Sequence, residues 1–505
     1  MIQRVHRRLL PSALGLIIGV ATLGPTAVAA RPAASLVPVT VNLRVMEFNI
    51  EYGGTVVSFD SIVRAVQAAD ADVVGVEEGQ GNVPRLAAAL GYPYFNVRLQ
   101  VISRLPLIDP PHGDGVYLYV EVAPGRVVAL ANVHLPPGPY SPNLVIRGAK
   151  RATILEIERR VRVPAVEPAT TALTGQVARG VPAVLLGDFN TPSRLDWTPE
   201  TVGLRDQIHY PVNWPVSRFV EDAGFVDSYR EAHPDPSASQ GLTWPSGRPR
   251  PPGAWNPGPH APADRIDFIY TAGDIGTLGS DLVGESGGPD VTVAVDPWGT
   301  DHRAVVSELM VTGGVPPTLV AVGTRLLEAG QDQTLTFHAP GGPEQHVVVF
   351  PAADPTYPVG DESVSGEADG TVIVPTDGWE PGTYVVQLMD GTSVLSRTRF
   401  WIEAPGDGPH VSTSRRAYHV GQAIRVRWWN APGARWDWIG VYRRGADPNI
   451  DAYLTWFYTR SSIRGSGTLD ADSEGPWPLT AGRYSVFLLA DDGYRVLARH
   501  PFVVR

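Results

Sequence analysis

Residues 181–190 read VPAVLLGDFN, an apolar run that ends in Gly187, Asp188, Phe189 and Asn190. A short apolar run bounded by glycine is typical of a buried strand that reaches the surface where the glycine stands. Side chains two residues apart project to the same side of an extended chain. We therefore expect the Asp188 carboxylate and the Asn190 amide to project together from the end of a core strand.

A second polar cluster lies far downstream. Thr300, Asp301 and His302 stand directly before the apolar run 304–310, which also has the composition of a strand. A carboxylate, an amide and an imidazole at strand ends are the groups that metal-assisted attack of water on a phosphate ester uses. The two stretches together predict that the chain hydrolyses a phosphate ester.

Between about residues 42 and 311, strand-like and helix-like segments alternate, which favours two sheets packed together with helices outside. Residues 232–263 are rich in Pro, Gly and Trp and are expected to form a long loop beside the site. Strands are expected at 43–50, 72–77, 97–103, 115–122, 127–134, 181–186, 264–270, 291–295 and 304–310, and helices at 61–69, 82–90 and 143–161.

Beyond Gly313 and Gly314 the helix pattern nearly disappears, and short strand-like runs alternate with Pro/Gly turns, as is typical of β-sandwiches. The tail also repeats itself at an offset of about 90 to 100 residues. We predict two related β-sandwich, immunoglobulin-like domains at residues 314–405 and 407–505. The second copy contains four tryptophans with no aromatic counterpart in the first, namely Trp428, Trp429, Trp436 and Trp438.

The first 30 residues are typical of an export signal. Arg4, Arg7 and Arg8 form a basic head, residues 12–24 are mostly apolar, and residues 27–29 form a small-residue cleavage site. The apolar part is short for a membrane span, although an anchoring helix is the alternative, and no later segment is long and apolar enough to cross. We expect a secreted protein with no integral membrane segment. The arginine pair loosely fits a twin-arginine signal, which leaves the export route open.

Composition limits the partners. The net charge is −11 at pH 7, whereas proteins that bind long stretches of nucleic-acid backbone are more often basic. The acidic balance disfavours long nucleic-acid tracts, but it does not exclude a nuclease whose active-site metal supplies positive charge locally. The chain has no cysteine, so it forms neither disulfides nor thiolate metal sites, and buried apolar area must stabilise it.

Polar residues recur at strand ends in a fixed order along residues 42–311. The series consists of Asn49 in MEFNI, Glu78 closing DVVGVEE, His134 in ANVHL, Asp188 and Asn190 in GDFN, Asp267 in RIDFIY, and the pair Asp301-His302. In this order and these surroundings, the series resembles the endonuclease/exonuclease/phosphatase superfamily. That superfamily includes DNase I-like nucleases, apurinic endonucleases, inositol-phosphate phosphatases and neutral sphingomyelinases. The resemblance implies an α+β fold, with a four-layer α/β/β/α sandwich over residues 42–313.

A divalent cation is the expected cofactor. Glu78 and Asp301 offer hard oxygen ligands, which suit Mg²⁺ and, less selectively, Mn²⁺. The resemblance implies that Asn49 helps to hold the metal and phosphate region. Glu77 adjoins Glu78, and strand alternation is expected to turn only one of the two inward; the resemblance selects Glu78.

The resemblance also implies roles for the remaining residues. Asp188 accepts a proton from the attacking water, and Asn190 fixes the phosphate or that water. His302 donates to a phosphate oxygen, Asp267 orients His302, and His134 protonates the leaving oxygen. Taken singly, His134 can be a satisfied histidine at a strand exit, and Asp188 with Asn190 can form an Asx turn.

The substrate stays open among nucleic acid, a phospholipid head group, an inositol phosphate and a monoester; His134 slightly favours a phosphodiester. A rival interpretation is a non-catalytic surface-binding protein that uses the same fold as a scaffold. The aromatic tail suits contact with carbohydrate or a membrane surface, and it equally suits a spacer or stabilising role. The sequence does not decide the oligomeric state.

Overall fold

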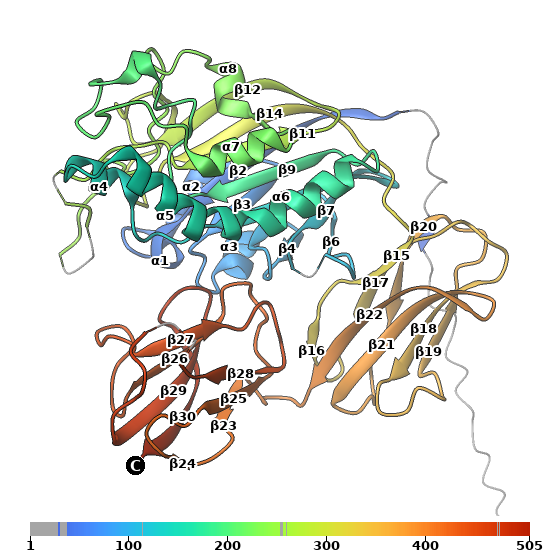
Figure 1. Ribbon diagram of the computed structural model, residues 1–505. Coiled ribbons are helices and arrows are strands. Elements are labelled where there is room, and N and C mark those ends of the chain that lie inside the picture. Colours follow the sequence, from blue (N-terminus) through green and yellow to red (C-terminus); the bar gives the residue numbers. More distant parts are fainter. Residues whose placement is uncertain are drawn as a thin grey trace, which may run out of the picture.

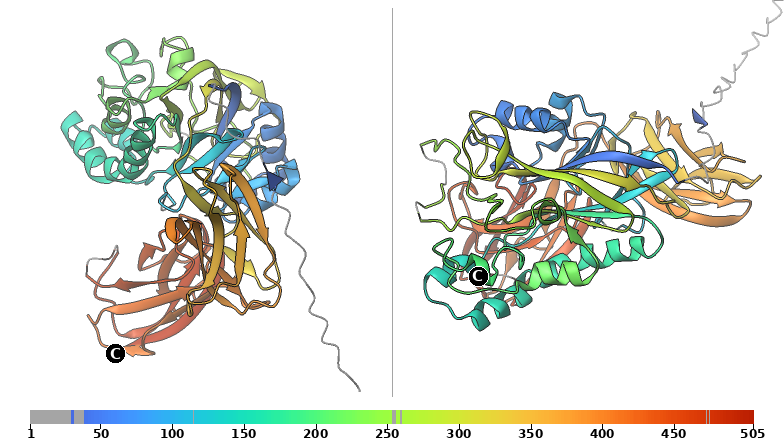
Figure 2. Two further views of the ribbon diagram at one scale, coloured as in Figure 1. Left: turned by 90° about the vertical axis from the view of Figure 1, so that its right-hand side faces the viewer. Right: turned by 90° about the horizontal axis from the view of Figure 1, so that it is seen from above.

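The computed structural model describes residues 29–30, 38–113, 115–252, 256–258, 260–471, 473 and 475–505. An α/β region of residues 38–313 is followed by a first β-module, strands β15 to β22, and a last β-module, strands β23 to β30. Figures 1 and 2 show the first β-module projecting to one side and the last β-module lying against the α/β region. The expected export signal lies outside the described residues, apart from β1 (Ala29–Ala30). No helix in the described ranges has the length and apolar character needed to cross a membrane.

Two sheets form the centre of the α/β region. The seven-stranded sheet has the order β13 (Val291–Ala294), β12 (Ile275–Gly284), β14 (Ala304–Thr312), β2 (Thr40–Asn49), β3 (Val73–Glu77), β5 (Val101–Ser103) and β4 (Tyr94–Asn96). The six-stranded sheet has the order β10 (Val226–Asp227), β11 (Asp267–Ala272), β9 (Ala183–Asp188), β8 (Arg126–His134), β7 (Leu118–Ala123) and β6 (Leu107–Ile108).

Helices cover the outer face of each sheet. The described elements are α1 (Glu51–Gly54), α2 (Phe59–Ala69), α3 (Val83–Leu90), α4 (Ser141–Ile146), α5 (Arg151–Val161), α6 (Val163–Val177), η1 (Pro199–Thr201), α7 (Pro215–Asp222) and α8 (Ser228–Ala232). Helices α2 and α3 pack on the seven-stranded sheet, and α6 and α7 pack on the six-stranded sheet. The layers therefore run helix, sheet, sheet, helix.

Apolar periodicity explains this layering. Val45 of β2 and Leu186 of β9 are fully buried between the two sheets. Phe48, which is an odd number of positions from Val45, points instead to the outer layer that contains Ile62 of α2. On the other side, Leu173 of α6 packs against the outer face of the six-stranded sheet. Strands β3, β9 and β11 are buried along their whole length, so the carboxylates Glu77, Asp188 and Asp267 stand at their ends.

Each β-module consists of two sheets that enclose one apolar core. In the first, β15 (Leu319–Val322), β17 (Gln333–His338) and β20 (Asp369–Val374) face β16 (Leu326–Glu328), β22 (Ser393–Glu403), β21 (Gly382–Asp390), β18 (Gln345–Pro351) and β19 (Gly360–Ser363). In the last, β23 (His410–Thr413), β25 (Ile424–Trp429) and β28 (Gly465–Leu469) face β24 (Ala417–Tyr418), β30 (Val496–Val504), β29 (Gly482–Leu489), β26 (Trp438–Arg443) and β27 (Thr455–Tyr458).

The two modules share their strand order. In both five-stranded sheets a short strand pairs in parallel with the module's last strand, and the remaining pairs are antiparallel. A register shift also falls at matching places, after Leu388 and after Leu488. The α+β class with a β-rich C-terminal part is thus confirmed, and the immunoglobulin-like assignment stays a prediction.

Several elements differ from the sequence expectation. The single helix expected at 143–161 is two helices, α4 and α5, and α6 follows where no helix was expected. Pro164 and Pro168 obscure α6 in the sequence because proline removes a helical N–H, yet the apolar face of α6 is buried on the sheet. Strand β12 was also missed, since its glycines weaken the strand pattern and pairing with β14 holds it. The described residues of 233–263 contain neither a helix nor a multi-residue strand, as expected.

Candidate active site

Strand register places three of the expected catalytic residues in one row. Strands β8 and β9 are parallel and β11 is antiparallel to β9, so that His134, Asp188 and Asp267 are direct neighbours across the six-stranded sheet. In the facing sheet, the parallel pair β2 and β3 ends with Asn49 beside Glu77. The ends of both sheets therefore meet at one place, although the residues are far apart in the sequence.

Asp188 is at the centre of this row. Its Oδ2 accepts a hydrogen bond from Asn49 Nδ2 at 3.1 Å and lies 3.6 Å from His134 Nε2 and 3.8 Å from His302 Nε2. Its Oδ1 accepts from the Asn190 backbone N–H at 2.8 Å, which is the Asx turn that the sequence left open. Burial, together with the neighbouring Asp267, raises the pKa of Asp188 to about 6. One oxygen shapes the turn and the other faces the site, so the two interpretations of Asp188 are compatible.

Asp267 and His302 form a second pair. The His302 Nδ1 lies 3.0 and 3.1 Å from the two carboxylate oxygens of Asp267, which is buried in β11. Burial alone would lower the pKa of His302, but the carboxylates of Asp267 and Asp188 raise it well above its ordinary value. The imidazole is therefore held as a cation with Nε2 directed toward Asp188.

Glu78 and Asp301, the expected metal ligands, line the same cavity, whose volume is about 500 Å³. Glu78 Oε2 accepts from the Tyr52 backbone N–H at 3.0 Å, and Asp301 Oδ2 accepts from Trp244 Nε1 at 3.0 Å. Asn49, the third expected ligand, donates from Nδ2 toward Glu78 at 3.4 Å. Both hard carboxylates thus face one cavity, and oxygen ligands of this kind suit a divalent cation.

The structure offers a second group of potential ligands. Asp188, Asp267 and His302 have ligand atoms within 4.8 Å of one another. These atoms already engage each other through the His302–Asp267 hydrogen bonds, which favours a proton-transfer role. The donor set of Glu78 and Asp301 is all oxygen and suits Mg²⁺ better.

Of the two adjacent glutamates only Glu78 lines the cavity, although strand alternation is not what directs it there. Glu77 belongs to β3 and lies between the sheets, 1 % exposed. Glu78 follows the strand with φ +54°, and this left-handed backbone breaks the alternation, so that Glu78 rather than Glu77 faces the cavity. Burial raises the pKa of Glu77 to about 8 and that of the neighbouring Glu47 well above its ordinary value. Burial thus favours the protonated form of both carboxyls beneath the site.

Glu51 is a site residue that sequence reasoning missed. It accepts from Arg248 Nη2 at 2.5 Å and from the Asp301 backbone N–H at 3.0 Å, and it lines the cavity. This carboxylate therefore fixes the segment that carries Asp301. Strand alternation gave no signal for it, because β2 ends at Asn49 and Glu51 begins α1 with φ +50°.

His134 contacts both the α/β region and the last β-module. Its Nε2 faces Asp188, and its Nδ1 lies 3.8 Å from Asp492 Oδ2. Burial would lower the pKa of His134, but Asp188 and Asp492 raise it above its ordinary value. A protonated His134 can deliver a proton to a leaving oxygen. The role expected for His134 thus has a partner, Asp492, that the sequence did not indicate.

Asp491 and Asp492 reach the site from a strained turn. Residues 490–493 form a tight turn, closed by the Gly493 N–H donating to the Ala490 carbonyl, and both central aspartates have positive φ. Asp491 Oδ1 accepts from Gln100 Nε2 at 2.6 Å, and Gln100 Oε1 accepts from the Gly79 backbone N–H. The turn therefore joins the last β-module to the loop that carries Glu78.

The fold and site together define an α/β/β/α sandwich protein with carboxylates and histidines gathered at its facing strand ends. The chain belongs to the Endonuclease/Exonuclease/phosphatase family, whose sequence model matches residues 46–302, just over half of the chain. Members of this family are generally hydrolases that act on phosphoesters, and they typically use a divalent metal.

Two further comparisons gave similar proteins. The chain is 26 % identical over 257 residues to a Caenorhabditis elegans protein described as "Uncharacterized protein F14F9.5", covering 46 % of this chain and 79 % of the relative. A solved complex of Dpr2 Ig1-Ig2 with DIP-Theta Ig1-Ig3 matches 38 % of this chain and 98 % of that chain at 12 % identity. Its TM-score is 0.14, so it indicates nothing about the fold of this chain.

Proposed function

We propose that the protein is a divalent-cation-dependent hydrolase that cleaves a phosphodiester with water. The observation that carries the proposal is the position of Asp188. It lies between His134 and the His302–Asp267 pair, on a cavity that Glu78 and Asp301 also line.

The chain's own residues account for the proton transfers. Asp188 takes a proton from the attacking water while the water oxygen bonds to phosphorus. His302 donates to a phosphate oxygen and is kept charged by Asp267. As the bond between phosphorus and the leaving oxygen breaks, His134 protonates that oxygen, so that the products are an alcohol and a phosphomonoester.

Glu78 and Asp301, with Asn49 beside them, would hold the cation. A bound Mg²⁺ or Mn²⁺ would neutralise phosphate oxygens and the charge on the leaving group. Asn190 lines the cavity and donates from Nδ2 to the Leu135 carbonyl at 3.0 Å, which holds its side chain where it would orient the phosphate or the water.

A substrate panel with metal titration tests the proposal. We expect hydrolysis of at least one phosphodiester among DNA, RNA, sphingomyelin, phosphoinositides and aryl phosphodiesters, with Mg²⁺ or Mn²⁺ stimulating turnover and EDTA abolishing it. Glu78→Gln should raise the Mg²⁺ concentration needed for half-maximal rate. Hydrolysis of monoesters alone would replace the diester assignment, and no metal-stimulated turnover of any member would favour a binding protein that uses the fold as a scaffold.

Export is a separate proposal, supported by the composition of residues 1–30. N-terminal sequencing of protein recovered from culture medium should find a chain that begins at Ala30. Retention of the full chain inside the cell would refute export. Secretion that continues when twin-arginine transport is blocked would exclude that route.

A further inference from the structure

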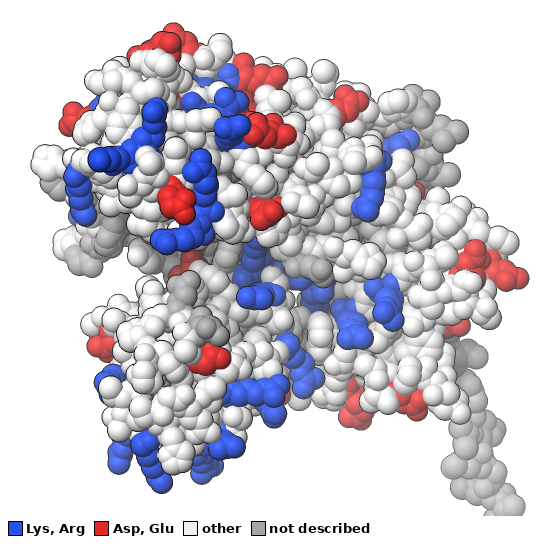
Figure 3. Space-filling model, in the orientation of Figure 1, with Lys and Arg blue, Asp and Glu red and all other residues white. Residues whose placement is uncertain are grey.

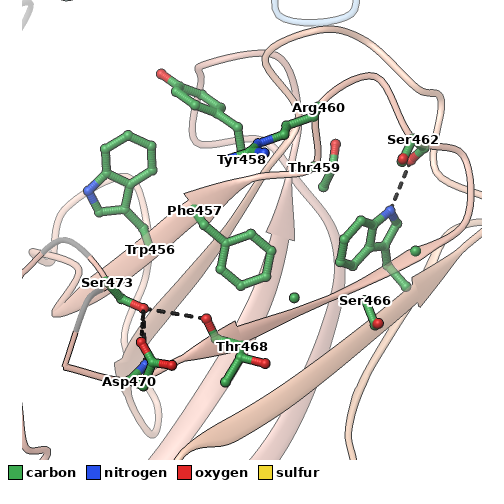
Figure 4. A pocket seen from close by; sticks show the side chains of 13 residues that line it. Trp456, Phe457, Tyr458, Thr459, Arg460, Ser462, Ser466, Thr468, Asp470 and Ser473 are labelled. Atoms are coloured by element: carbon green, nitrogen blue, oxygen red, sulfur yellow. Dashed lines mark hydrogen bonds between the residues drawn. The ribbon is translucent and has the colours of Figure 1, made fainter. Parts of the chain in front are cut away.

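The side of the cavity opposite the catalytic strands is built by the last β-module. Six of its residues line the cavity, and all but one are aromatic: Trp438, Tyr453, Trp456, Tyr458, Asp492 and Tyr494. Figure 4 shows Trp456 and Tyr458 on one side of β27 and Phe457 on the other, as strand alternation requires. Only the side that carries Trp456 and Tyr458 faces the catalytic residues.

Three of these rings form the corner of a box. The Trp438 and Tyr453 ring centroids are 5.4 Å apart at an interplanar angle of 74°, and those of Tyr453 and Trp456 are 6.3 Å apart at 72°. Trp438 and Trp456 are 6.2 Å apart at 85°. Each plane is thus nearly perpendicular to the other two, and all three residues line the same cavity.

The side of the cavity built by the last β-module carries a negative charge. Asp492 accepts a hydrogen bond from the Tyr458 hydroxyl at 2.7 Å, which holds the carboxylate beside the rings. Glu78 and Asp301 lie on the catalytic side, and among the residues that the structure describes, neither a lysine nor an arginine lines this cavity. In Figure 3 basic side chains gather instead where the α/β region and the two β-modules meet, and Arg98, Arg325, Arg460 and Arg464 line a separate cavity there.

This combination selects one kind of substrate group. Faces of Trp and Tyr rings attract organic cations, most strongly where water is excluded. A polynucleotide would bring further phosphates toward carboxylates with no arginine to receive them, although its bases could stack on the same rings. We propose that the substrate is a phosphodiester of an amino alcohol, whose ammonium or quaternary ammonium group binds among Trp438, Tyr453 and Trp456 with Asp492 as the counter-charge. The inference rests on the proposed function, since it names the substrate class of that site.

A matched pair of substrates tests the charge alone. In p-nitrophenyl phosphorylcholine the alcohol ends in a quaternary nitrogen, and in p-nitrophenyl 3,3-dimethylbutyl phosphate a carbon replaces that nitrogen. We expect kcat/KM for the choline ester to exceed that for its carbon isostere by about tenfold, the usual size of a partly desolvated cation–π contact. Thymidine 5′-(p-nitrophenyl phosphate) is included to detect base stacking, and it should be the poorer substrate.

Single variants locate the binding group. Tyr453 is 41 % exposed and Trp456 is partly exposed, so both tolerate replacement without unfolding the module. Tyr453→Leu and Trp456→Leu should each remove most of the preference for the choline ester, so that the ratio of kcat/KM between the choline ester and its carbon isostere falls toward one. Trp429→Leu is the matched control, because Trp429 stacks on His410 and lies outside the cavity; it should change neither value.

Binding without turnover separates this inference from the proposed function. Tetramethylammonium chloride should change the tryptophan fluorescence saturably, with sodium chloride as the ionic-strength control, and Trp456→Leu should weaken the response. If both esters are cleaved equally, or the thymidine ester is preferred, the amino-alcohol assignment is overturned while the hydrolase stands. If tetramethylammonium binds but no ester is cleaved, the proposed function fails and the cation site stands. Absence of saturable binding overturns the site directly.

Discussion

The first and last β-modules have the same strand order but meet the α/β region in different ways. Arg325 of the first module donates to the buried Asp109 at 2.9 Å, and none of this module's residues lines the active-site cavity. The last module inserts Asp491 and Asp492 between the loops of the α/β region and supplies the aromatic wall. One copy of the repeat is thus attached beside the site, whereas the other forms part of it.

The difference lies in a few substitutions at matching strand positions. Strands β18 and β26 occupy the same place in their sheets. His346 of β18 pairs with Asp361 on an exposed surface, and the matching Trp438 of β26 donates from Nε1 to the Gly493 carbonyl beneath the turn that reaches the site. A sheet face that is polar in one module has become aromatic in the other. The positions at which the two copies differ therefore include those at which the last module contacts the site.

The largest effect is expected from the α/β region alone. Asp188→Asn removes the proton acceptor and His302→Ala removes the donor to phosphate, so each should lower kcat by about 10²- to 10⁴-fold or more. Asp188→Asn keeps the size of the side chain and should stay folded, whereas His302→Ala leaves the buried Asp267 without its partner and should also lower the thermal midpoint. Steady-state kinetics with matched circular dichroism measure this. Turnover retained by both folded variants would show that the active site lies elsewhere. The two modules could then no longer be compared by their distance from this cavity.

The next effect should come from the junction with the last β-module. Gln100→Ala leaves the Asp491 carboxyl and the Gly79 N–H buried without their partner, at a cost of about 1–3 kcal/mol for each group. We expect kcat/KM to fall by about tenfold, because the aromatic wall and Asp492 shift relative to the catalytic strands. Kinetics and chemical denaturation measure the two consequences. Unchanged kinetics despite lower stability would show that the wall takes no part in turnover.

The sequence alone predicts those helices and strands whose pattern of apolar residues lies within the element itself. The run VPAVLLGD predicts β9 because every residue in it is buried, and α2 follows from apolar residues at helical spacing. The ordered polar positions could be predicted as one site, because a strand end is the only surface that a buried strand has. Glu77 and Glu78 show the limit of this reasoning, since one left-handed residue reverses which side chain faces the site.

Contacts made by docking could not be predicted. Trp438 and Asp492 have no periodic signal that points to His134, and their place follows from how one folded module lies against another. The sequence showed that four tryptophans of the second copy have no aromatic counterpart in the first. It did not show which residues those tryptophans contact. Helix α6 was missed for a related reason, because burial against a sheet outweighs the local cost of its prolines.

A pH experiment sharpens the contrast between the modules. Asp437 of the last module is fully buried where the first has the neutral Gln345, and burial raises the pKa of its carboxyl from 3.8 to about 7. The folded state therefore binds more protons than the unfolded chain between pH 4 and 7, so stability falls as the pH rises through this window. The fall should be on the order of 4 kcal/mol, at about 1.4 kcal/mol for each unit of pKa. Asp437→Asn should flatten this dependence in denaturation followed by tryptophan fluorescence. An equal slope in the variant would assign the dependence to other groups.

The smallest effect is expected at the attachment of the first β-module. Arg325→Ala leaves Asp109 paired with Arg98 at 2.8 and 3.1 Å, so the buried carboxylate keeps its charge partner and the loss should be about 1 kcal/mol or less. Because this module contributes nothing to the cavity wall, kcat/KM for either p-nitrophenyl ester should stay within about twofold of the parent value. Arg98→Ala is the contrasting variant, since it removes the bidentate partner from Asp109 and should destabilise the protein more. Arg325→Ala could instead lower activity as much as Gln100→Ala does. That result would mean that the first module also positions the site. The contact of each module with the α/β region, rather than the aromatic substitutions, would then be what affects turnover.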